Sequence, residues 1–281
     1  MQNQIKGILF DWDGSIVPQG GCIDSKVAAF FRFMHGLGIK MGPATGKNDA
    51  YMRGAAVGIG IPMWSFIVAE TAGVILKLTE PGPPPIFEQI PLSETGRKDI
   101  AALAYHIKFN QFLRQFEIRG EKIKYRPELK ETMITIFPPG KDLSVTEPWK
   151  EHFEKVIQTH GLELAVHRHS DGCIDIVPKD ISKRRGVLRI CELLDCKPEN
   201  ILTVVDGEND FELAEGTTAI AVGNAKPSLK ELVARQGGFV ADFLDGCGFM
   251  QGAYHFALSG AFGEASKTIV EYLDEIENWK R

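Results

Sequence analysis

Two aspartates near the start of the chain have a spacing suited to phosphoryl chemistry. The segment DWDGS begins at Asp11 and directly follows the apolar run at residues 8–10. Side chains alternate along a strand, so Asp11 and Asp13 are expected to point the same way. Two carboxylates on one side repel each other, and Mg²⁺ suits such a place because it prefers one or two carboxylates together with water and phosphate oxygens. One carboxylate can then attack phosphorus while the other moves protons, whereas a plain turn would leave both aspartates merely solvated.

A second acidic group has the same placement later in the chain. The segment DGEND, from Asp206 to Asp210, follows the strongly β-branched run at 201–205. Acidic side chains at the carboxyl end of a parallel strand lie where open α/β sheets bind ligands, and they form a candidate cation site. Asn209 or Asp210 is equally suited to cap a following helix, so a purely structural role stays open here.

Two weaker motifs add a hydroxyl group and positive charge. Thr45-Gly46 follows an expected strand, and a hydroxyl with nearby backbone N–H groups at a helix start can hold a phosphate, although Thr-Gly is also a common turn. Lys47 beside it is either a ligand or a solvated lysine. Lys183 stands at the start of an expected helix, where the helix dipole disfavours a cation unless that cation faces an anion. An exposed lysine in a basic run is the alternative.

The elements expected to position these residues follow a β/α alternation at both ends of the chain. Four prolines at 81 and 83–85 break that alternation and mark a boundary, and a second boundary is expected near Pro178. The middle region instead predicts an α+β unit with antiparallel strands. The outer strands are expected at 8–10, 39–41, 65–69, 201–205 and 219–222, with helices at 24–36, 184–195, from Pro227, and 264–279. The middle elements are expected as helices at 99–116 and 148–160, a strand at 133–137, and a hairpin over 162–177 that turns at 170–172.

Composition sets limits on the class of protein. The chain has 281 residues and a formal net charge of −5, which favours neither a nucleic-acid binder nor a polybasic membrane protein. Its five cysteines form no CxxC pair, so neither a disulfide framework nor a zinc ribbon is indicated. We expect a cytoplasmic protein with no membrane span. An anionic substrate would need local positive charge or a metal.

In this order, the four motifs resemble those of the haloacid dehalogenase-like hydrolase superfamily. The resemblance is to subfamily IIB, the Cof-like and sucrose-phosphatase-like phosphatases, whose cap lies between the second and third motifs. The family patterns DxDG[TS], ATGR, SKG and GDxxND correspond here to DWDGS, ATGK, ISKRRG and VDGEND. IVAETAGVI and AIAVGNAKPSLKELV also look similar to this branch. The chain departs from the pattern at Val205, which replaces a glycine, at Lys47, which replaces an arginine, and at Arg184-Arg185, which separate the usual Lys-Gly pair.

The resemblance implies a fold and a domain division. The fold would be α/β, with a Rossmann-like parallel-sheet core at 1–81 and 178–281. An inserted α+β cap at 82–177 would set substrate specificity.

It also implies roles for individual residues. Asp11 would be the nucleophile that forms a phosphoaspartate, and Asp13 would protonate the leaving oxygen and then activate water. Thr45 would bind the transferred phosphoryl group, and Lys183 would stabilise its charge. The implied Mg²⁺ site comprises Asp11, Asp13 (through its backbone carbonyl), Asp206 and Asp210. The implied phosphate or substrate contacts are Gly14, Gly46, Lys47 and Asn209.

Substrate recognition is less well specified by the sequence. His167 and His169 alternate on one face of an expected hairpin strand, with Arg168 opposite, and are candidates to contact a sugar or a carboxylate. A solvated sheet face explains them as well, and no third ligand for a metal is evident. The expected function is a Mg²⁺-dependent phosphatase acting on a small phosphorylated metabolite, favouring a sugar phosphate. The alternatives are a sugar phosphomutase, a phosphoglycolate-type phosphatase and a non-catalytic binding protein, in each case a monomer or homodimer.

Overall fold

The structure, a computed structural model, divides into two compact units. The core unit contains residues 1–90 and 183–281, and the inserted unit contains residues 91–182. The described residues are 4–62, 64–80, 86–90, 98–103, 115–118, 121–124, 126–137, 146–169 and 172–276. The sequence predicted the unit boundaries at 81/82 and 177/178. Both boundaries lie later in the structure, at 90/91 and 182/183. The first is shifted because β5 (Ile86–Ile90) pairs with β4 (Val74–Glu80) and thereby belongs to the core unit.

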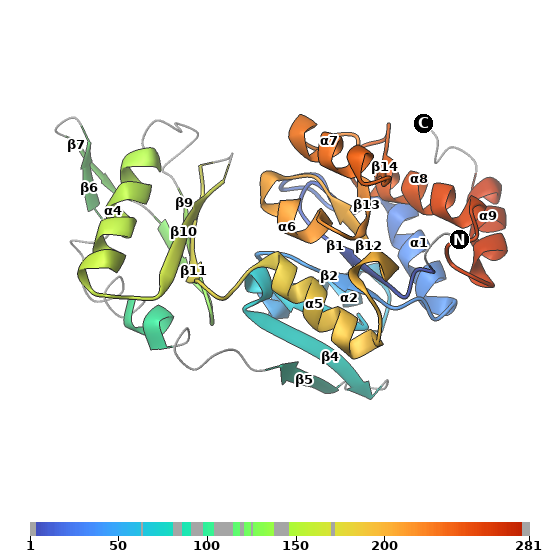
Figure 1. The fold of residues 1–281 in the computed structure, drawn as a ribbon, viewed down its shortest axis with the longest axis horizontal. Coiled ribbons are helices and arrows are strands. Elements are labelled where there is room, and N and C mark those ends of the chain that lie inside the picture. Colours follow the sequence, from blue (N-terminus) through green and yellow to red (C-terminus); the bar gives the residue numbers. More distant parts are fainter. Residues whose placement is uncertain are drawn as a thin grey trace. The chain divides into compact units, whose positions relative to one another are not determined.

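A five-stranded parallel sheet forms the centre of the core unit. Its strand order is β14-β13-β12-β1-β2, and every pairing in it is parallel (Figure 1). From β1 the chain leads to β2 on one side, whereas the strands that follow β12 lie on the other side. The carboxyl ends of β1 and β12 therefore form a topological switch point, which is where open α/β sheets bind ligands. The strands are β1 (Gly7–Phe10), β2 (Met41–Pro43), β12 (Ile201–Val205), β13 (Thr218–Ala221) and β14 (Phe239–Val240).

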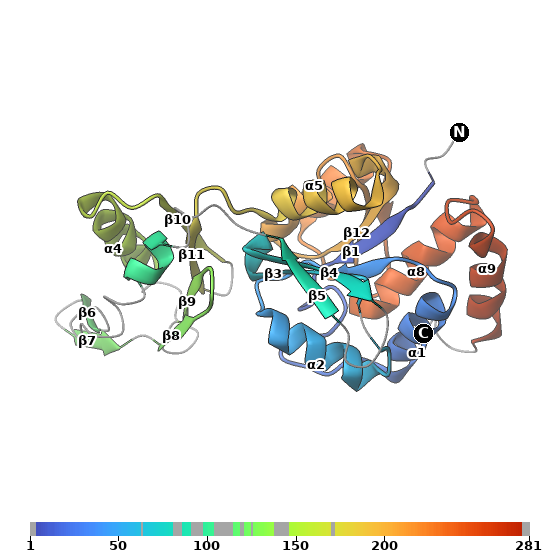
Figure 2. The ribbon, with the colours of Figure 1, turned by 90° about the horizontal axis from the view of Figure 1, so that it is seen from below.

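Helices cover both faces of this sheet. In Figure 2, α5 lies on one side of the sheet, and α1 and α2 lie on the other. Phe31 of α1 packs against Phe10 of β1, with ring centroids 5.1 Å apart, and against Phe249 of α8 at 5.5 Å. These fully buried aromatic rings anchor α1 and α8 to the strand that precedes Asp11. The helices are α1 (Ser25–Gly36), α2 (Asp49–Ile59), α5 (Lys183–Leu194), α6 (Phe211–Ala214), α7 (Pro227–Arg235), α8 (Asp245–Leu258) and α9 (Ala265–Glu275).

A second, antiparallel sheet adjoins the edge of the first. It has the order β3-β4-β5, with β3 at Phe66–Ala69, and a parallel bridge between Ala44 and Val68 links it to the end of β2. The turn between β3 and β4 is left-handed at three successive residues other than glycine, Glu70, Thr71 and Ala72, with φ of 50°, 57° and 71°. A left-handed conformation costs such residues free energy, so surrounding contacts must hold this turn in place.

The inserted unit is a separate α+β body. An antiparallel sheet of order β10-β11-β9-β8 packs one face against α4 (Thr146–Thr159), whose Trp149, Phe153 and Ile157 join the isoleucines of β9 and β11 in one apolar cluster. Residues 98–103 are helical, and β6 and β7 form a two-stranded ladder. The strands are β6 (Gln115–Ile118), β7 (Glu121–Lys124), β8 (Arg126–Leu129), β9 (Ile134–Phe137), β10 (Leu164–Arg168) and β11 (Ile174–Pro178).

The predicted fold class, an α/β core with a parallel sheet and an inserted α+β unit, is confirmed, and several local predictions are wrong. The helix expected over 99–116 cannot extend to its end, because residues 115–118 form β6 and pair Glu117 with Lys122. The strand expected at 39–41 begins at Met41. The proline-rich segment 81–85 and the turn residues 170–171 lie outside the described residues.

No helix among the described residues is long and apolar enough to cross a membrane.

Candidate active site

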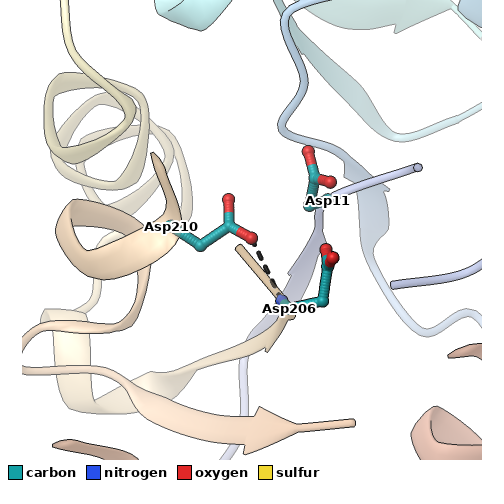
Figure 3. A group of neighbouring side chains, drawn as sticks. All are labelled: Asp11, Asp206 and Asp210. Carbon is teal, nitrogen blue, oxygen red and sulfur yellow. Dashed lines mark hydrogen bonds between the residues drawn. The ribbon is translucent and has the colours of Figure 1, made fainter. Parts of the chain in front are cut away.

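Two of the predicted aspartates stand side by side at the switch point of the parallel sheet. Asp11 follows β1 and Asp206 follows β12, and the Asp11 amide donates a hydrogen bond to the carbonyl oxygen of Val204 at 3.0 Å. With Asp210 they form a group in which one carboxylate oxygen from each residue lies within 4.8 Å of the other two. Figure 3 shows the three side chains converging from the two strand ends and the turn after β12.

A tight turn after β1 supports the carboxylate of Asp206. Gly14 has φ +84°, and a Cβ at this position would lie only 2.3 Å from Oδ2 of Asp206, so glycine is required for both conformation and space. The Ser15 hydroxyl donates to Oδ1 of Asp206 at 2.8 Å. Asn224 fixes the same turn from the other side, because its Nδ2 donates to the carbonyl oxygen of Gly14 at 2.6 Å. Gly14 therefore serves the site through its missing side chain.

Lys183 supplies the positive charge inside the acidic group. It is the first residue of α5, its side chain is 2% exposed, and its Nζ donates to Oδ1 of Asp11 at 2.8 Å and to Oδ1 of Asp210 at 2.5 Å. The helix carrying it packs tightly on β3, because a Cβ at Gly186 would lie 2.5 Å from Cγ1 of Val68. Burial of a lysine in this manner requires the paired carboxylates.

Asp210 links the lysine to the backbone of its own turn. Its carboxylate is fully buried, and Oδ2 accepts hydrogen bonds from the amides of Asp206 and Gly207, each at 3.1 Å. Asn209 is exposed, and a Cβ added at Gly207 would lie only 2.3 Å from its Oδ1. The DGEND segment thus forms a compact turn in which Asp210 faces inward and Asn209 outward.

The charges of this group are unbalanced. The pKa of Asp11 is raised to about 8, mainly by burial and also by repulsion from Asp210 and Asp206, and the attraction of Lys183 offsets only part of this rise. Burial and the Asp210 charge raise the pKa of Asp206 to about 6. For Lys183, burial lowers the pKa, but the ion pairs with Asp11 and Asp210 outweigh it and hold the pKa above its ordinary value. One ammonium group thus faces three carboxylates, and the excess negative charge favours a further cation.

The donor set fits Mg²⁺. The side-chain ligand atoms that Asp11, Asp206 and Asp210 offer are carboxylate oxygens, which hard divalent cations prefer. Burial and the neighbouring carboxylates raise the pKa values of Asp11 and Asp206, so a cation bound to both would stabilise their ionised forms. The Asp13 side chain does not belong to this group. Its carboxylate instead forms an ion pair with Lys47, with 2.9 Å between Oδ2 and Nζ.

Thr45 lies in the loop after β2, on the other side of β1 from Asp206. Its neighbour Ala44 donates from its amide to the carbonyl oxygen of Phe10 at 2.7 Å, which fixes the loop beside Asp11. The amide of Thr71 donates to the carbonyl oxygen of Thr45 at 3.0 Å, so the left-handed turn after β3 also supports this loop. Thr45 is buried, and Gly46, the next residue, is half-buried.

The three candidate substrate contacts of the inserted unit, His167, Arg168 and His169, lie in different surroundings. His169 Nε2 lies 2.8 Å from Oδ2 of Asp175, and Asp175 also accepts from the Thr135 hydroxyl at 2.7 Å. His167 is exposed, and it pairs in register with Asp175 across β10 and β11. Arg168 forms an ion pair with Glu147 at 3.2 Å. His169 is thus held by the Asp175 carboxylate, which is 13% exposed.

Sequence reasoning assigned no role to several residues that build this site. Ser15 and Asn224 stood inside quoted motifs, but their bonds to Asp206 and Gly14 join residues 191 and 210 positions apart, and no local pattern reveals such pairs. The left-handed turn at 70–72 lacks the glycine or asparagine that would have signalled it.

Comparison with known proteins identifies the family. The family description "haloacid dehalogenase-like hydrolase" matches residues 95–242, just over half of the chain. The chain belongs to the haloacid dehalogenase-like hydrolase family. A curated relative, the phosphoglycolate phosphatase of Methanopyrus kandleri, is 25% identical over 244 residues that cover 84% of this chain and 94% of the relative. The chain is therefore an enzyme of the phosphatase type.

Solved structures share the fold. The sucrose-phosphatase from Synechocystis sp. PCC6803, solved with sucrose and phosphate, has a TM-score of 0.62 at 18% identity and covers 90% of this chain and 98% of its own. The subclass IIB sugar phosphatase BT4131 has a TM-score of 0.57 at 19% identity, covering 84% and 93%. The predicted resemblance to subfamily IIB is thereby confirmed at the level of fold.

Proposed function

We propose that the protein is a Mg²⁺-dependent phosphatase of small phosphomonoesters that works through a phosphoaspartate on Asp11. The observation that supports this most directly is the buried group in which Lys183 bonds Asp11 and Asp210 while Asp206 stands beside them. A carboxylate that is fixed at a strand end, next to a buried ammonium group, is suited to attack a phosphoryl group whose negative charge the ammonium stabilises.

The proposed reaction has two halves. An oxygen of Asp11 attacks phosphorus while the bond from phosphorus to the leaving oxygen breaks, and the protonated Asp13 carboxyl gives its proton to that oxygen. Asp13, now a carboxylate, then takes a proton from a water molecule whose oxygen attacks phosphorus. The bond between phosphorus and Asp11 breaks, inorganic phosphate leaves, and both aspartates return to their starting states.

The remaining residues bind and orient the phosphoryl group in this proposal. Thr45 would donate its hydroxyl to a phosphoryl oxygen, with Gly46 as part of the same loop, and Lys183 would neutralise charge from the opposite side. Asp11, Asp206 and the backbone carbonyl of Asp13 would hold Mg²⁺, and Asp210 would orient Lys183 and the backbone of Asp206. When bound, Mg²⁺ would supply positive charge to the phosphoryl oxygens.

Two substrate classes are proposed. A sugar phosphate is the first, supported by the resemblance of the motifs to sucrose-phosphatase-like enzymes. Phosphoglycolate is the second, supported by the phosphoglycolate phosphatase relative, which the chain matches over 94% of its length. Substrate choice is proposed to reside in the inserted unit, whose His167, Arg168 and His169 are candidate contacts.

The deciding experiment measures phosphate release from a panel of phosphate esters. The panel contains sucrose, hexose, trehalose and mannosylglycerate phosphates and phosphoglycolate, each with Mg²⁺ and with EDTA. The proposal expects release that requires Mg²⁺ and is lost in Asp11→Asn. An isomerised sugar phosphate without free phosphate would indicate a mutase instead, and full activity in Asp11→Asn would refute the nucleophile. Glu208→Gln, an exposed change in the turn after β12, serves as the control and should keep its activity.

A further inference from the structure

The side chain of Lys47 is directed at Asp13 and is supported by an aromatic ring. Its Nζ lies 2.9 Å from Oδ2 of Asp13 and 4.6 Å from the ring centroid of Tyr51. The Lys47 and Asp13 side chains are 29% and 34% exposed, so this ion pair is partly shielded from water. A cation over an aromatic face is attracted by the ring quadrupole, so the ring favours the same ammonium position as the carboxylate.

Backbone hydrogen bonds fix the segments that carry Lys47 and Tyr51. The Lys47 amide donates to the Thr45 hydroxyl oxygen at 3.2 Å, and the Lys47 carbonyl oxygen accepts from the Glu70 amide at 3.0 Å. Tyr51 stands in the first turn of α2, where its amide donates to the side chain of the N-cap residue Asn48 at 2.8 Å. The loop and the helix start therefore present lysine and ring to each other in one geometry.

We propose that Lys47, supported by the ring of Tyr51, is a positioning residue for Asp13, holding that carboxyl group in the orientation that proton transfer requires. This inference rests on the proposed phosphatase function. It replaces the phosphate contact that the family resemblance implied for Lys47. In a direct phosphate contact the ammonium group would act on every substrate alike, whereas a positioning role acts only where Asp13 must transfer a proton.

The leaving group distinguishes the two roles. The leaving group of an alkyl phosphate is a strongly basic alkoxide, which needs the proton of Asp13 while its bond to phosphorus breaks. The leaving group of 4-nitrophenyl phosphate is a stable phenolate, which needs no proton. The ratio kcat/KM covers only the steps up to departure of the leaving group, so loss of Asp13 positioning should reduce this ratio for the alkyl substrate alone. The later attack by water needs Asp13 with either substrate.

The test compares Lys47→Met and Tyr51→Leu with the wild-type protein on glycerol phosphate and 4-nitrophenyl phosphate. Lys47→Met is expected to lower kcat/KM for the alkyl substrate by at least about tenfold, because general acid catalysis contributes 10²–10⁴-fold in full. The same ratio for the nitrophenyl substrate should change by less than about twofold, with a burst of nitrophenolate before slow turnover. Tyr51→Leu should show the same pattern at about two- to fivefold, the scale of an exposed cation–π contact.

Controls separate the possible outcomes. Arg53→Met removes a cation of the neighbouring helix α2, one that pairs with Asp49 on the helix surface, and should leave both ratios unchanged. Tyr51→Phe keeps the ring and should retain the wild-type selectivity between substrates. Equal losses on both substrates, with weaker inhibition by inorganic phosphate, would overturn the inference in favour of a phosphate contact. If Lys47→Met fails to fold, the exposed Tyr51→Leu variant still decides. A wild-type protein inactive on every phosphate ester would refute the proposed function itself.

Discussion

Asp210→Asn tests whether the buried ion group stabilises the core unit. The Asp210 carboxylate is fully buried and accepts from Lys183 and from the amides of Asp206 and Gly207. An asparagine of the same shape can keep its oxygen on the two amides, but its NH₂ group then faces the ammonium of Lys183. Breaking a buried pair from one side costs about 3–5 kcal/mol.

Two effects reduce that cost. Lys183 keeps its bond to Asp11, and the substitution removes a charge that repels Asp11 and Asp206. The net loss in free energy of unfolding is therefore expected at about 2–3 kcal/mol, below the full cost of a broken pair.

The assay is a urea titration in EDTA, followed by far-ultraviolet circular dichroism. Glu208→Gln is the matched control, because it removes a carboxylate from the same turn at an exposed position and should change the free energy of unfolding by less than about 0.5 kcal/mol. An Asp210→Asn variant as stable as this control would refute the reasoning. A more stable variant would show that repulsion among the carboxylates outweighs the ion pair.

Three further predictions follow from named contacts. Gly14→Ala should abolish Mg²⁺-dependent phosphate release, because its Cβ would displace the Asp206 carboxylate, whereas Gly54→Ala, which meets no atom within 4 Å, should raise helix stability by about 0.5–1 kcal/mol in thermal unfolding. In the metal-free protein the Asp11 pKa of about 8 lies above its ordinary 3.8, so the protonated form stabilises the fold at low pH and that contribution is lost as pH rises through 8. Stabilisation by Mg²⁺ in thermal scans should therefore be larger at pH 8 than at pH 6. An equal shift of the unfolding temperature at both pH values would contradict this. For Asp175, burial raises the pKa, but the His169 and Thr135 hydrogen bonds and the Lys130 charge lower it below 3.8. Asp175→Asn should therefore lower the free energy of unfolding by about 1–3 kcal/mol at neutral pH, and this difference from wild type should shrink as pH falls through the folded pKa. A difference in the free energy of unfolding that is independent of pH in urea titrations would count against it.

The parallel-sheet core could be predicted because its signals are local. The β-branched run at 201–205 and the apolar run at 8–10 each end at an acidic motif, and strand ends of one parallel sheet lie at one edge. The placement of Asp11 and Asp206 therefore followed from strand boundaries, whereas an exposed surface position stayed open for Lys183.

Other elements gave no usable local signal. Helix α8 contains Gly246, Gly248 and Gly252, which lower helix propensity but allow contact with Val27, Val222 and Ile220. Here tertiary packing outweighs propensity. In the same way, β4 and β5 adjoin the prolines that suggested a linker, and their pairing became visible only in three dimensions.

At the candidate site, too, some features could be predicted from the sequence and others could not. The identities of Asp11, Asp13, Thr45 and Lys183 came from motifs, but their partners did not. The ion pair between Asp13 and Lys47 depends on the direction of a long side chain, which the spacing of residues does not determine. His169 was considered as a substrate contact or as part of a solvated sheet face, and it bonds Asp175 because β11 brings that carboxylate alongside.

The most direct test of the central claim is detection of the phosphoaspartate. Asp13→Asn should form this intermediate from 4-nitrophenyl phosphate, which needs no proton, and should hydrolyse it slowly. After an acid quench in the presence of Mg²⁺, mass spectrometry is predicted to find one added phosphoryl group per chain, on the peptide that carries Asp11. The same treatment of a variant with both Asp11→Asn and Asp13→Asn should find none. A phosphoryl group on another residue, or turnover by Asp11→Asn, would contradict the account.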